Sequence, residues 1–527
     1  MNNNKHTYVI NILLPCVVFS AIAGILTSIV IFLFKICSSH LIQLSEKIYA
    51  AARADLRILP LLLLGAAVIG TVAALILKAS PDSRGGGIPT AIAALRGLIP
   101  LKKTISIITV FFSSLLTFLC GVPLGTEGPS VQMGAISGKL TARLFEKDHS
   151  AWKRYIMTGG ACAGFGAATG APLTGIFFAF EEAHKRFSPM LFMISAMAVA
   201  FCTATTELLC SLFSLSPDLF HFEIAEALPL KYIWVSIAVG ILCAAASYIL
   251  TIAYRFKINH LDFLSKKLPF SFDIILIFVL TAVIGLFSKN SIGTGHSLID
   301  ELIEGGGVWF LLPIYFVIRA IMMIIANTRG VTGGLFVPNL TFGAIIGALC
   351  AKACVALEIL PKEYYTAVVV IGMVSFLGAS SRTPITAITF AIEALSGFAN
   401  ILPIIVGVTI AFITIEATGI TAFTDTVIEG KAEQYNHGLT PKAYDMYLTV
   451  KNDAFAIGKE VKDILWPPST VIVSVNNAHS KVRIGYGMAE GDVLHIHIKT
   501  AHIEESKKEL EALLGKQEKD AFGDEFS

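Results

Sequence analysis

Long apolar runs, separated by short polar stretches, occupy most of the chain up to about Phe423. A run of about 20 residues is what an α-helix needs to cross the hydrocarbon core of a bilayer. The first run is too long and too poorly flanked for a cleavable signal peptide, so we interpret it as the first membrane helix. The pattern predicts an all-α polytopic membrane domain, whose clearest helices are 8–34, 58–77, 105–122, 190–213, 233–253 and 274–287.

From about residue 451 the pattern becomes that of a small soluble α/β unit. A β-rich run at 470–475 and an alternating run at 492–499 predict strands, and the charged periodic run at 503–514 predicts a helix. The polar residues after this helix predict a disordered end. The expected division is a transmembrane domain at 1–450 (halves at about 8–215 and 225–425), a small cytoplasmic domain at 451–515 and a disordered tail at 516–527.

Many of the predicted membrane helices are interrupted by glycine and proline. Unsatisfied backbone groups are costly in hydrocarbon, so broken helices persist where protein or a water-filled cavity surrounds them. Transporters use such breaks to aim the ends of half-helices at an ion. We therefore expect broken, tilted helices around an ion site.

Composition supports a membrane environment and argues against several other classes. The 527 residues are 55 % hydrophobic and only 15 % charged, whereas soluble domains carry about 25 % charged residues. The net charge of +2 gives no indication of nucleic-acid binding. The nine cysteines lie in apolar stretches without a CxxC or Cys/His cluster, which argues against a disulfide framework or a metal site. The absence of a nucleophile–base set or a phosphate-binding loop argues against an enzyme, and we expect no cofactor.

Three blocks of sequence recur in the same order at a nearly constant offset, which indicates an internal duplication. Residues 125–136 match 334–345, 209 residues later, through glycine and proline positions. Residues 172–181 match 384–393 at an offset of 212, and several glycines follow the same spacing. The first block ends in cations at 184–186, whereas its copy has none. The positive-inside rule then places the first end in the cytoplasm and the second end outside, as in an inverted repeat. Such repeats place the ion site between the halves, near the bilayer midplane.

Positions at which the two halves differ are the better candidates for function. Glu127 corresponds to Phe336 in the second half, and an ionisable group within the membrane indicates function by default. Glu127 precedes Pro129 by two residues, which predicts a carboxylate at a helix N-terminus, where free N–H groups favour anions. It would imitate a bound anion and leave on protonation, which links proton binding to anion binding. The alternative is an ordinary capping glutamate.

Glu182 is the second carboxylate without a counterpart, because Ala394 occupies its place in the second half. It lies at the predicted cytoplasmic end of its helix. From the residues alone, two interpretations stay open: a proton relay to Glu127, or a surface carboxylate paired with Lys185 or Arg186. Glu181 and its counterpart Glu393 match, so we interpret both as structural.

The glycine-rich motifs then identify a resemblance over roughly residues 8–450. Gly85-Gly-Gly-Ile-Pro89 is similar to GSGIP, Gly125-Thr-Glu-Gly-Pro129 to GREGP, and Gly334-Leu-Phe-Val-Pro338 to GxFxP. Together and in order, they resemble the CLC family of chloride channels and chloride/proton antiporters. The resemblance implies a homodimer with one anion pathway per subunit, in a fold of tilted helices with an inverted repeat. Glu127 then matches the gating glutamate, and Glu182 the internal proton glutamate of the antiporters.

The same resemblance implies an anion site. Backbone N–H groups near Leu335 and Phe336 and a tyrosine hydroxyl late in the chain would hold the anion. Tyr444 fits the tyrosine motif better than Tyr435. The remaining expected anion-binding residues come from the other two motifs, and they are Gly86, Gly87, Ile88, Thr126 and Gly128.

Two motif positions depart from the family pattern. Gly86 replaces the serine whose hydroxyl contacts the anion in chloride-selective members, so nitrate or another halide is an open alternative to chloride. Thr126 replaces the motif arginine and removes a positive charge beside the gate. We expect weaker attraction of anions there.

The functional hypothesis is exchange of chloride or another small anion for protons across the lipid bilayer. The alternative is a passive voltage- or pH-gated chloride channel of the same fold, and a fluoride exporter suits Gly85–Pro89 and Glu182 poorly. The C-terminal domain resembles a small TrkA-C type regulatory module, which would bind a small ligand; the alternative is a lobe that stabilises the dimer. A potassium uptake protein could carry such a tail, but no TVGYG-like filter is present. We expect a bacterial plasma membrane protein with both termini in the cytoplasm.

Overall fold

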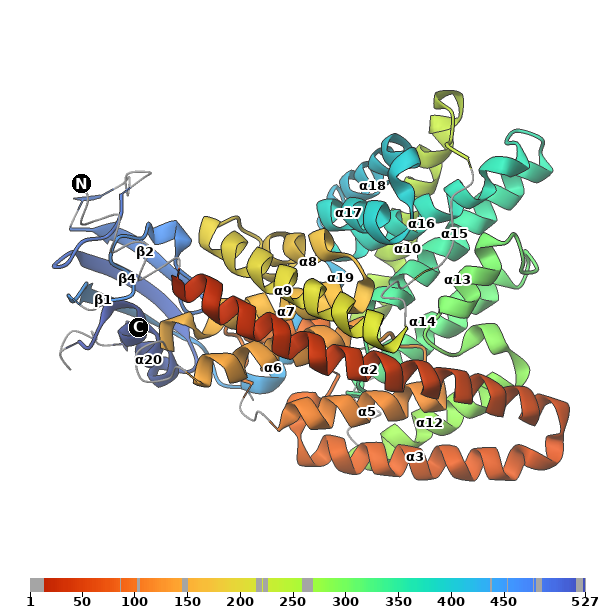
Figure 1. Ribbon diagram of the computed structural model, residues 1–527, viewed down its shortest axis with the longest axis horizontal. Coiled ribbons are helices and arrows are strands. Elements are labelled where there is room, and N and C mark those ends of the chain that lie inside the picture. Colours follow the sequence, from red (N-terminus) through yellow and green to blue (C-terminus); the bar gives the residue numbers. More distant parts are fainter. Residues whose placement is uncertain are drawn as a thin grey trace.

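Figure 1 shows an elongated molecule in which a large helical part carries a small sheet at one end. This computed structural model describes residues 14–85, 87–101, 105–144, 150–214, 220, 226–257, 269–436, 438–452, 454–476, 478–479, 486–517 and 525–526. We call the described residues 14–436 the membrane domain and the described residues 442–526 the tail domain.

The membrane domain consists of helices of unequal length. Among the described residues, eight are long and apolar enough to span a bilayer. Several shorter helices begin at a proline or after a glycine, as the glycine and proline pattern predicts. The helices of the first half are α2 (Leu14–Ala54), α3 (Leu59–Ala79), α4 (Ile88–Leu95), α5 (Ser106–Cys120), α6 (Glu127–Arg143), α7 (Lys153–Thr169), α8 (Pro172–Phe178) and α9 (Pro189–Phe213). A π-helical turn, Ala179–Ala183, follows α8.

The second half repeats this arrangement of long and short helices. Its helices are α10 (Ile233–Phe256), α12 (Phe270–Phe287), α13 (His296–Ile303), α14 (Leu312–Thr328), α15 (Phe336–Ala356), α16 (Tyr365–Ser381), α17 (Pro384–Ala394), α18 (Ile401–Glu416) and α19 (Phe423–Asn436). Each of the six clearest predicted membrane helices is confirmed as a helix within the described residues, and residues 8–13 of the first lie outside them. The first differs most in extent, because α2 has 41 residues and continues far beyond residue 34. At 1.5 Å per residue it is about 60 Å long, roughly twice the hydrocarbon thickness.

In both halves, two helices cross in close contact at glycine residues. In the first half α6 and α7 approach so closely that a Cβ on Gly134 would overlap the carbonyl oxygen of Gly160. In the second half α15 and α16 do the same at Gly343 and Gly372. Small residues at such crossings allow helix backbones to touch, which stabilises packing within a membrane. The glycines that match in the duplication therefore serve as scaffold.

Glu181 and Glu393 join the halves by reciprocal capping. The Glu181 carboxylate accepts hydrogen bonds from the N–H groups of Ile385 (2.9 Å) and Thr386 (2.6 Å) at the start of α17. Glu393 accepts the equivalent bonds from the first turn of α8, at 2.7 and 2.8 Å. Each carboxylate also accepts a threonine hydroxyl at 2.7 Å. Since helix starts carry free N–H groups, these caps fit the structural role predicted for both residues.

The tail domain is a five-stranded antiparallel sheet with one helix on it. The strand order is β3-β2-β4-β1-β5. The bounds are β1 (Lys442–Thr449), β2 (Thr470–Val475), β3 (Ala478–His479), β4 (Val493–Thr500), α20 (Ile503–Leu514) and β5 (Glu525–Phe526). Buried residues of β1 and β4 pack against Leu510, Leu513 and Leu514 of α20. The predicted strand at 470–475 and the predicted helix at 503–514 are confirmed, and β4 is displaced by one residue from 492–499.

The predicted start of the tail domain differs from the structure. The domain was expected to begin at 451, but β1 begins at Lys442 and pairs along its whole length with β4. Most of the end at 516–527, which is predicted to be disordered, lies outside the described residues, so that prediction stays untested. Of its described residues, Gln517 donates to the carbonyl oxygen of Thr449 at 2.8 Å and β5 pairs with β1. Edge pairing of this kind depends on distant residues, which local polarity does not report.

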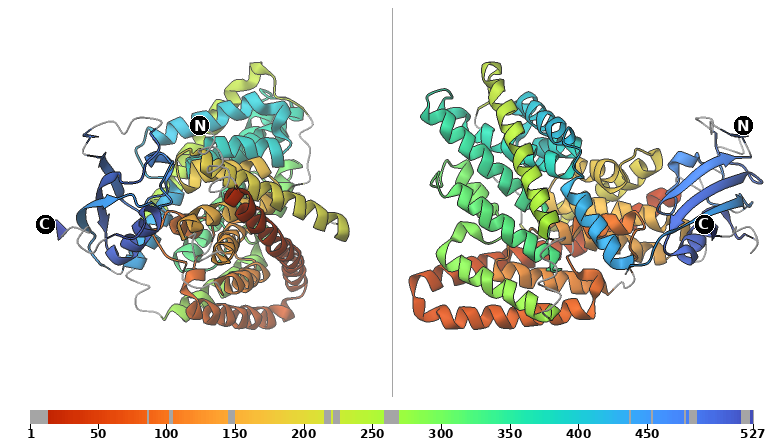
Figure 2. Two further views of the ribbon diagram at one scale, coloured as in Figure 1. Left: turned by 60° about the vertical axis from the view of Figure 1, so that its left-hand side comes forward. Right: turned by 180° about the vertical axis from the view of Figure 1, so that it is seen from behind.

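The tail domain lies against the start of α2 and the start of α7, as the two views of Figure 2 show. Cys16 and Phe19 of α2 are buried with Trp152, Tyr155 and Leu465 in one apolar cluster. The Tyr155 hydroxyl donates to the carbonyl oxygen of Asp463 at 2.8 Å and accepts from the N–H of Leu465 at 2.9 Å. The beginning of α2 and the tail domain therefore lie at the same end of the molecule.

Candidate functional site

The two matching glycine motifs meet in the middle of the membrane domain. The N–H of Gly125 donates to the carbonyl oxygen of Gly334 at 2.8 Å, and the N–H of Gly334 donates to that of Gly125 at 2.6 Å. These two bonds form an isolated antiparallel bridge between the halves. The third motif joins them, because a Cβ on Gly128 would lie 2.5 Å from the Cα of Gly334 and 2.8 Å from that of Gly87.

Three helices begin at this meeting point, as the motifs predict. They are α4 at Ile88, α6 at Glu127 and α15 at Phe336. Each start presents N–H groups that lack an intrahelical partner and the positive end of a helix dipole. Several such ends together form a site for an anion. The N–H of Gly87, however, is already bound, because it donates to Oε1 of Gln132 at 3.0 Å.

Glu127 places its carboxylate between two of these helix starts. Its side chain is fully buried (0 % exposed). Oε1 accepts a hydrogen bond from the Thr126 hydroxyl at 3.0 Å. Within the described residues Oε2 has no well-aligned hydrogen-bond partner, although the backbone amide of Val337 in α15 faces the carboxylate. The carboxyl group of Glu127 thus occupies a place where backbone N–H groups favour an anion.

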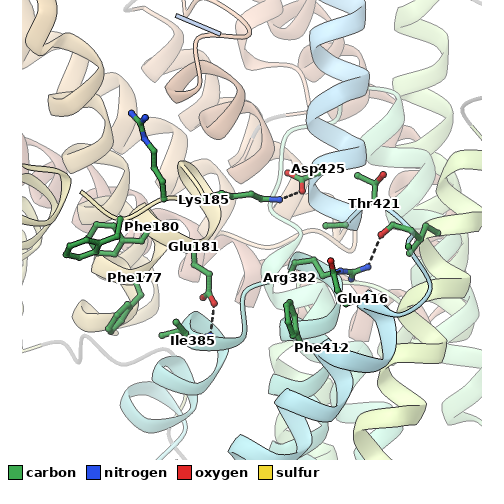
Figure 3. Close-up of a pocket in the computed structure, with 15 residues that line it drawn as sticks. Phe177, Phe180, Glu181, Lys185, Arg382, Ile385, Phe412, Glu416, Thr421 and Asp425 are labelled. Carbon is green, nitrogen blue, oxygen red and sulfur yellow. Dashed lines mark hydrogen bonds and ion pairs between the residues drawn. The ribbon is translucent and has the colours of Figure 1, made fainter. Parts of the chain in front are cut away.

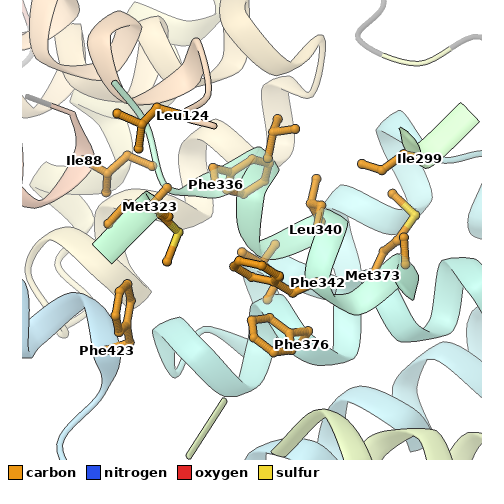
Figure 4. Packing of buried hydrophobic residues seen from close by; sticks show 14 of the residues in the cluster. Ile88, Leu124, Ile299, Met323, Phe336, Leu340, Phe342, Met373, Phe376 and Phe423 are labelled. Carbon is orange, nitrogen blue, oxygen red and sulfur yellow. The ribbon is translucent and has the colours of Figure 1, made fainter. Parts of the chain in front are cut away.

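Apolar side chains enclose this meeting point. Ile88, Leu335 and Phe336 are each about 5 % exposed or less. Figure 4 shows Ile88, Leu124 and Phe336 close together, with Met323 and Phe423 on the same side of the cluster. Such a surrounding lowers the local dielectric and strengthens the interaction of the helix starts with charge. Of the expected anion-binding residues, Gly87, Ile88, Thr126, Gly128, Leu335 and Phe336 come together here, and Gly86 lies outside the described residues.

Tyr444 does not lie at this site. It lies in β1 of the tail domain, where it pairs with Ile498 and packs against the tail core. Tyr435 lies near the end of α19, with its ring centroid 4.9 Å from that of His502. Phe423, the first residue of α19, is buried in the membrane-domain core and has no hydroxyl; its ring centroid lies 5.1 Å from that of Tyr254 in the same core. The expected tyrosine was sought by local motif, whereas the end of the last apolar run would have indicated Phe423.

Glu182 lies at the far end of α4 from the motif bridge. It is 6 % exposed and belongs to the π-helical turn after α8. Arg96, which follows α4, donates to the carbonyl oxygens of Glu182 (2.7 Å) and Ala183 (2.8 Å). The same guanidinium forms an ion pair with Asp425 at 3.1 Å. Eight residues of α4 correspond to about 12 Å, so a single short helix connects the surroundings of the two glutamates.

Glu182 is next to a charged cavity of about 650 Å³, which we call the Glu181 cavity. Figure 3 shows Glu181, Lys185 and Asp425 around it, with Arg382 and Glu416 on the opposite side. Lys185 pairs with Asp425, and Arg382 with Glu416 at 2.9 Å. The alternative interpretation pairs Glu182 with Lys185 or Arg186. Lys185 pairs with Asp425 in the structure, and Arg186 donates to the carbonyl oxygen of Ile464 at 2.8 Å. Glu182 nevertheless interacts electrostatically with these charges.

A second cavity, of about 710 Å³, reaches Thr126, and we call it the Thr126 cavity. Lys35 of α2 and His296 of α13 line it together with Thr126. Lys35 interacts electrostatically with both Glu127 and His296. A lysine from α2 therefore supplies a positive charge near Glu127, where Thr126 supplies none. Sequence reasoning missed Lys35, because it is 91 residues before Thr126 and carries no motif.

Within the described residues, no group of three His, Cys, Asp or Glu side chains could hold a metal ion. The cysteines there are free.

Comparison with known proteins places these motifs in a family. The model of the family described as "Voltage gated chloride channel" matches residues 65–416. The H(+)/Cl(-) exchange transporters ClcA of Yersinia pestis bv. Antiqua (strain Angola) and Yersinia pseudotuberculosis serotype O:3 (strain YPIII) are each 28 % identical over 344 residues. The alignments cover 63 % of this chain and 70 % of each relative.

Solved structures share the fold. The crystal structure of a slow cyanobacterial Cl-/H+ antiporter superposes with a TM-score of 0.71 at 23 % identity, covering 80 % of this chain and 99 % of that one. A CLC-type fluoride/proton antiporter gives a TM-score of 0.58 at 19 % identity, covering 76 % of this chain and 95 % of that one. Because the family match covers residues 65–416, well over half of the sequence, this chain belongs to the voltage-gated chloride channel family.

Proposed function

We propose that this chain exchanges chloride, or another small anion, for protons across the plasma membrane, with Glu127 as its gate. One observation carries the gate: a buried carboxylate lies between the starts of α6 and α15, where backbone N–H groups favour an anion. Deprotonated Glu127 competes with the transported anion for this place. Protonation removes its charge, so the side chain can leave and the anion can enter. The exchange activity of the ClcA relatives agrees with this proposal.

The proton reaches Glu127 from the other end of α4. The Glu181 cavity gives water access beside Glu182, which is buried and surrounded by Arg96, Asp425 and Lys185. Glu182 takes the proton from this cavity and passes it toward Glu127. The anion arrives from the opposite side through the Thr126 cavity, where Lys35 attracts it. The sequence neighbour of each glutamate, Glu181 or Thr126, thus lines a different cavity.

The direction of these routes follows from the proposed orientation. We assign the Glu181 cavity to the cytoplasm, because Lys185 and Arg186, which line it, carry positive charge there. The start of α2 and the tail domain lie at one end of the molecule, which agrees with both termini in the cytoplasm. The multi-pass fold and the bacterial relatives support a plasma membrane location. A homodimer, with one pathway in each subunit, is part of the proposal.

Flux from reconstituted vesicles tests the exchange. An outward chloride gradient should drive protons uphill, as measured with a chloride electrode and a pH electrode in the same chamber. Chloride movement without proton movement would overturn the exchanger and leave a passive channel. Glu182→Gln should slow proton movement strongly, whereas Glu363→Gln, an exposed carboxylate before α16, should not. Equal proton movement in both variants would return Glu182 to a structural role.

The preferred anion is a separate part of the proposal. Gly86 offers no hydroxyl, and the start of α19 offers Phe423 instead of a tyrosine. Both absences remove hydrogen bonds that chloride would receive, so we expect nitrate to compete well with chloride. Gly86→Ser should raise the chloride-to-nitrate permeability ratio. An unchanged ratio would show that Gly86 does not set selectivity.

A further inference from the structure

A third cavity, of about 380 Å³, lies between the tail domain and the membrane domain, and we call it the interdomain cavity. It is lined by the end of α4 and the loop after it, by α6, by the start of α7 and by α20. The charged lining residues are Lys139 of α6, Lys153 and Arg154 of α7, and Glu505, Lys508 and Glu509 of α20. All charged lining residues from the membrane domain are therefore cations. The cavity is separate from the anion pathway and from Glu182.

The positive charge in this cavity exceeds the negative charge. The start of α7, at Lys153, adds the positive end of a 17-residue helix to the side-chain cations. Lys139 is only 4 % exposed. Its ammonium donates to the carbonyl oxygen of Leu101, so the positive charge that Lys139 adds to the cavity is held in place by the chain itself. Four cationic side chains and a helix start face two carboxylates, so the site is suited to a further anion.

The nearest carboxylate is a loose partner. Glu509 lies 3.7 Å from Nη1 of Arg154 and its side chain is 43 % exposed. A direct charge-assisted hydrogen bond is about 2.7–2.9 Å long. The Glu509 carboxylate thus stands near the cations without a tight bond to Arg154. A phosphate group, with more charge and more acceptor oxygens, can displace it.

We propose that the interdomain cavity binds a small phosphate-bearing anion that controls how the tail domain holds the membrane domain. The volume of about 380 Å³ is within the range of ligand pockets, about 300–1,000 Å³. It fits a diphosphate or a small phosphorylated metabolite. A lipid headgroup carries the same phosphate chemistry, and the experiment below separates the two sources. The site does not depend on the tail being a TrkA-C module, which stays a prediction.

Arg154 connects this cavity with α4. Its Nε donates to the carbonyl oxygen of Leu95, the last residue of α4, at 3.0 Å. Its Nη1 donates to the carbonyl oxygens of Leu465 (3.2 Å) and Trp466 (2.9 Å) in the tail domain. One guanidinium therefore joins the tail, the cavity and the cytoplasmic end of α4. A phosphate group that binds the Arg154 guanidinium weakens or reorients these hydrogen bonds.

Movement at this end of α4 reaches both glutamates. Arg96, directly after Leu95, holds the carbonyl oxygen of Glu182. The tail also contacts Gly97, since a Cβ there would lie 3.1 Å from Cδ of Pro468. The other end of α4 begins beside the Glu127 site. Occupancy of the interdomain cavity should therefore change the transport rate. This effect on transport rests on the proposed function, whereas the binding of phosphate to the cavity does not rest on it.

Binding is tested on full-length protein in a neutral detergent, with inorganic pyrophosphate as the probe. Isothermal titration calorimetry should show saturable binding. The double variant Lys153→Ala with Lys508→Ala should weaken it by about tenfold or more, the loss of roughly 1.4 kcal/mol of interaction. Glu509→Gln should strengthen it by about threefold, because the competing carboxylate charge is lost. Lys499→Ala, an exposed cation of β4 away from the cavity, is the matched control and should leave it unchanged.

Flux in vesicles separates the sources of the phosphate. Pyrophosphate inside vesicles of neutral phosphatidylcholine should change chloride flux in the wild type and not in the double variant. A flux difference between neutral and phosphatidylglycerol-containing vesicles that the double variant abolishes would instead assign the site to a lipid headgroup. Equal behaviour of the double variant and Lys499→Ala in both arms and in calorimetry would overturn the proposal. Wild-type flux without any phosphate is measured first, so a failure of the transport proposal is recognised separately.

Discussion

The two motif loops that meet in the membrane domain are built alike and carry different chemistry. Gly125 and Gly334 hold each other through two reciprocal hydrogen bonds, and a helix begins two residues after each. At the first position of these helices one half has Glu127 and the other has Phe336. Glu127 places a carboxylate against the helix starts, whereas the Phe336 ring packs edge-on against Phe165 and Phe390, with centroids 5.1 and 5.0 Å apart. The two loops thus share one backbone arrangement. The difference between Glu127 and Phe336 at the equivalent position gives the first loop an ionisable group that the second lacks.

Replacing the ionisable Glu127 by a neutral side chain should have the largest effect on transport of the changes at these two loops. Glu127→Gln keeps the shape of the side chain and its bond with Thr126 but cannot lose and regain a proton. We expect proton movement driven by a chloride gradient to disappear while anion flux persists. Phe336→Leu, at the equivalent position, is the matched control and should retain proton movement. Persistent uphill proton movement in Glu127→Gln would contradict the gate.

The glycines of the first loop should differ sharply from one another. A Cβ on Gly128 would meet backbone atoms of Gly334 and Gly87, which cannot move away without separating the three motifs. We expect Gly128→Ala to destabilise the protein by about 3 kcal/mol or more, visible as a lower melting temperature in detergent and low yield. A Cβ on Gly125 would meet Oε2 of Glu127 at 2.5 Å, which is the end of a flexible side chain. Gly125→Ala should therefore fold normally and displace the Glu127 carboxylate, with altered anion flux. Equal melting temperatures for the two variants would contradict the crowding at Gly128.

The reciprocal caps extend the comparison to the ends of the halves. Glu393→Gln and Glu181→Gln each remove a charge that binds two backbone N–H groups and a threonine hydroxyl. Hydrogen bonds to charged groups contribute about 1.5–3 kcal/mol each at most, and the amide retains part of the bonding, so we expect a loss of roughly 2 kcal/mol in each. Similar decreases in melting temperature are the expected result. Only Glu181→Gln should also alter proton movement, because Glu181 lines the cavity beside Glu182. A much smaller decrease in one variant would break the symmetry of the caps.

The sequence alone predicts the features that follow from repeated motifs and local composition. It does not predict which residues from distant segments the fold brings together. The duplication, the helix starts and Glu127 follow from glycine, proline and charge at fixed spacing. Membrane helix positions follow from apolar length, and the strand at 470–475 follows from local β-rich composition. Tyr444 was misplaced because β1 and the last membrane helix are adjacent in sequence, and no local signal separates them. Phe423 is buried in the core because α19 begins there, and its only sequence signal was the end of the last apolar run, since no motif marks it.

Substitution of Lys35 should have the smallest effect on transport and gives the most specific test. Only the fold brings this residue near the first loop. It interacts with Glu127 from the Thr126 cavity, whereas the second loop, with Leu335 at the position of Thr126, is enclosed by apolar side chains. Lys35→Gln removes one positive charge from the anion's approach, so chloride flux at low concentration should fall about twofold to fivefold and depend less on ionic strength. Lys47→Gln, an exposed cation of the same helix, is the control. If both variants transport equally at low and high salt, the charge of Lys35 does not steer anions toward Glu127. Lys35 would then not compensate for the positive charge that is missing at Thr126.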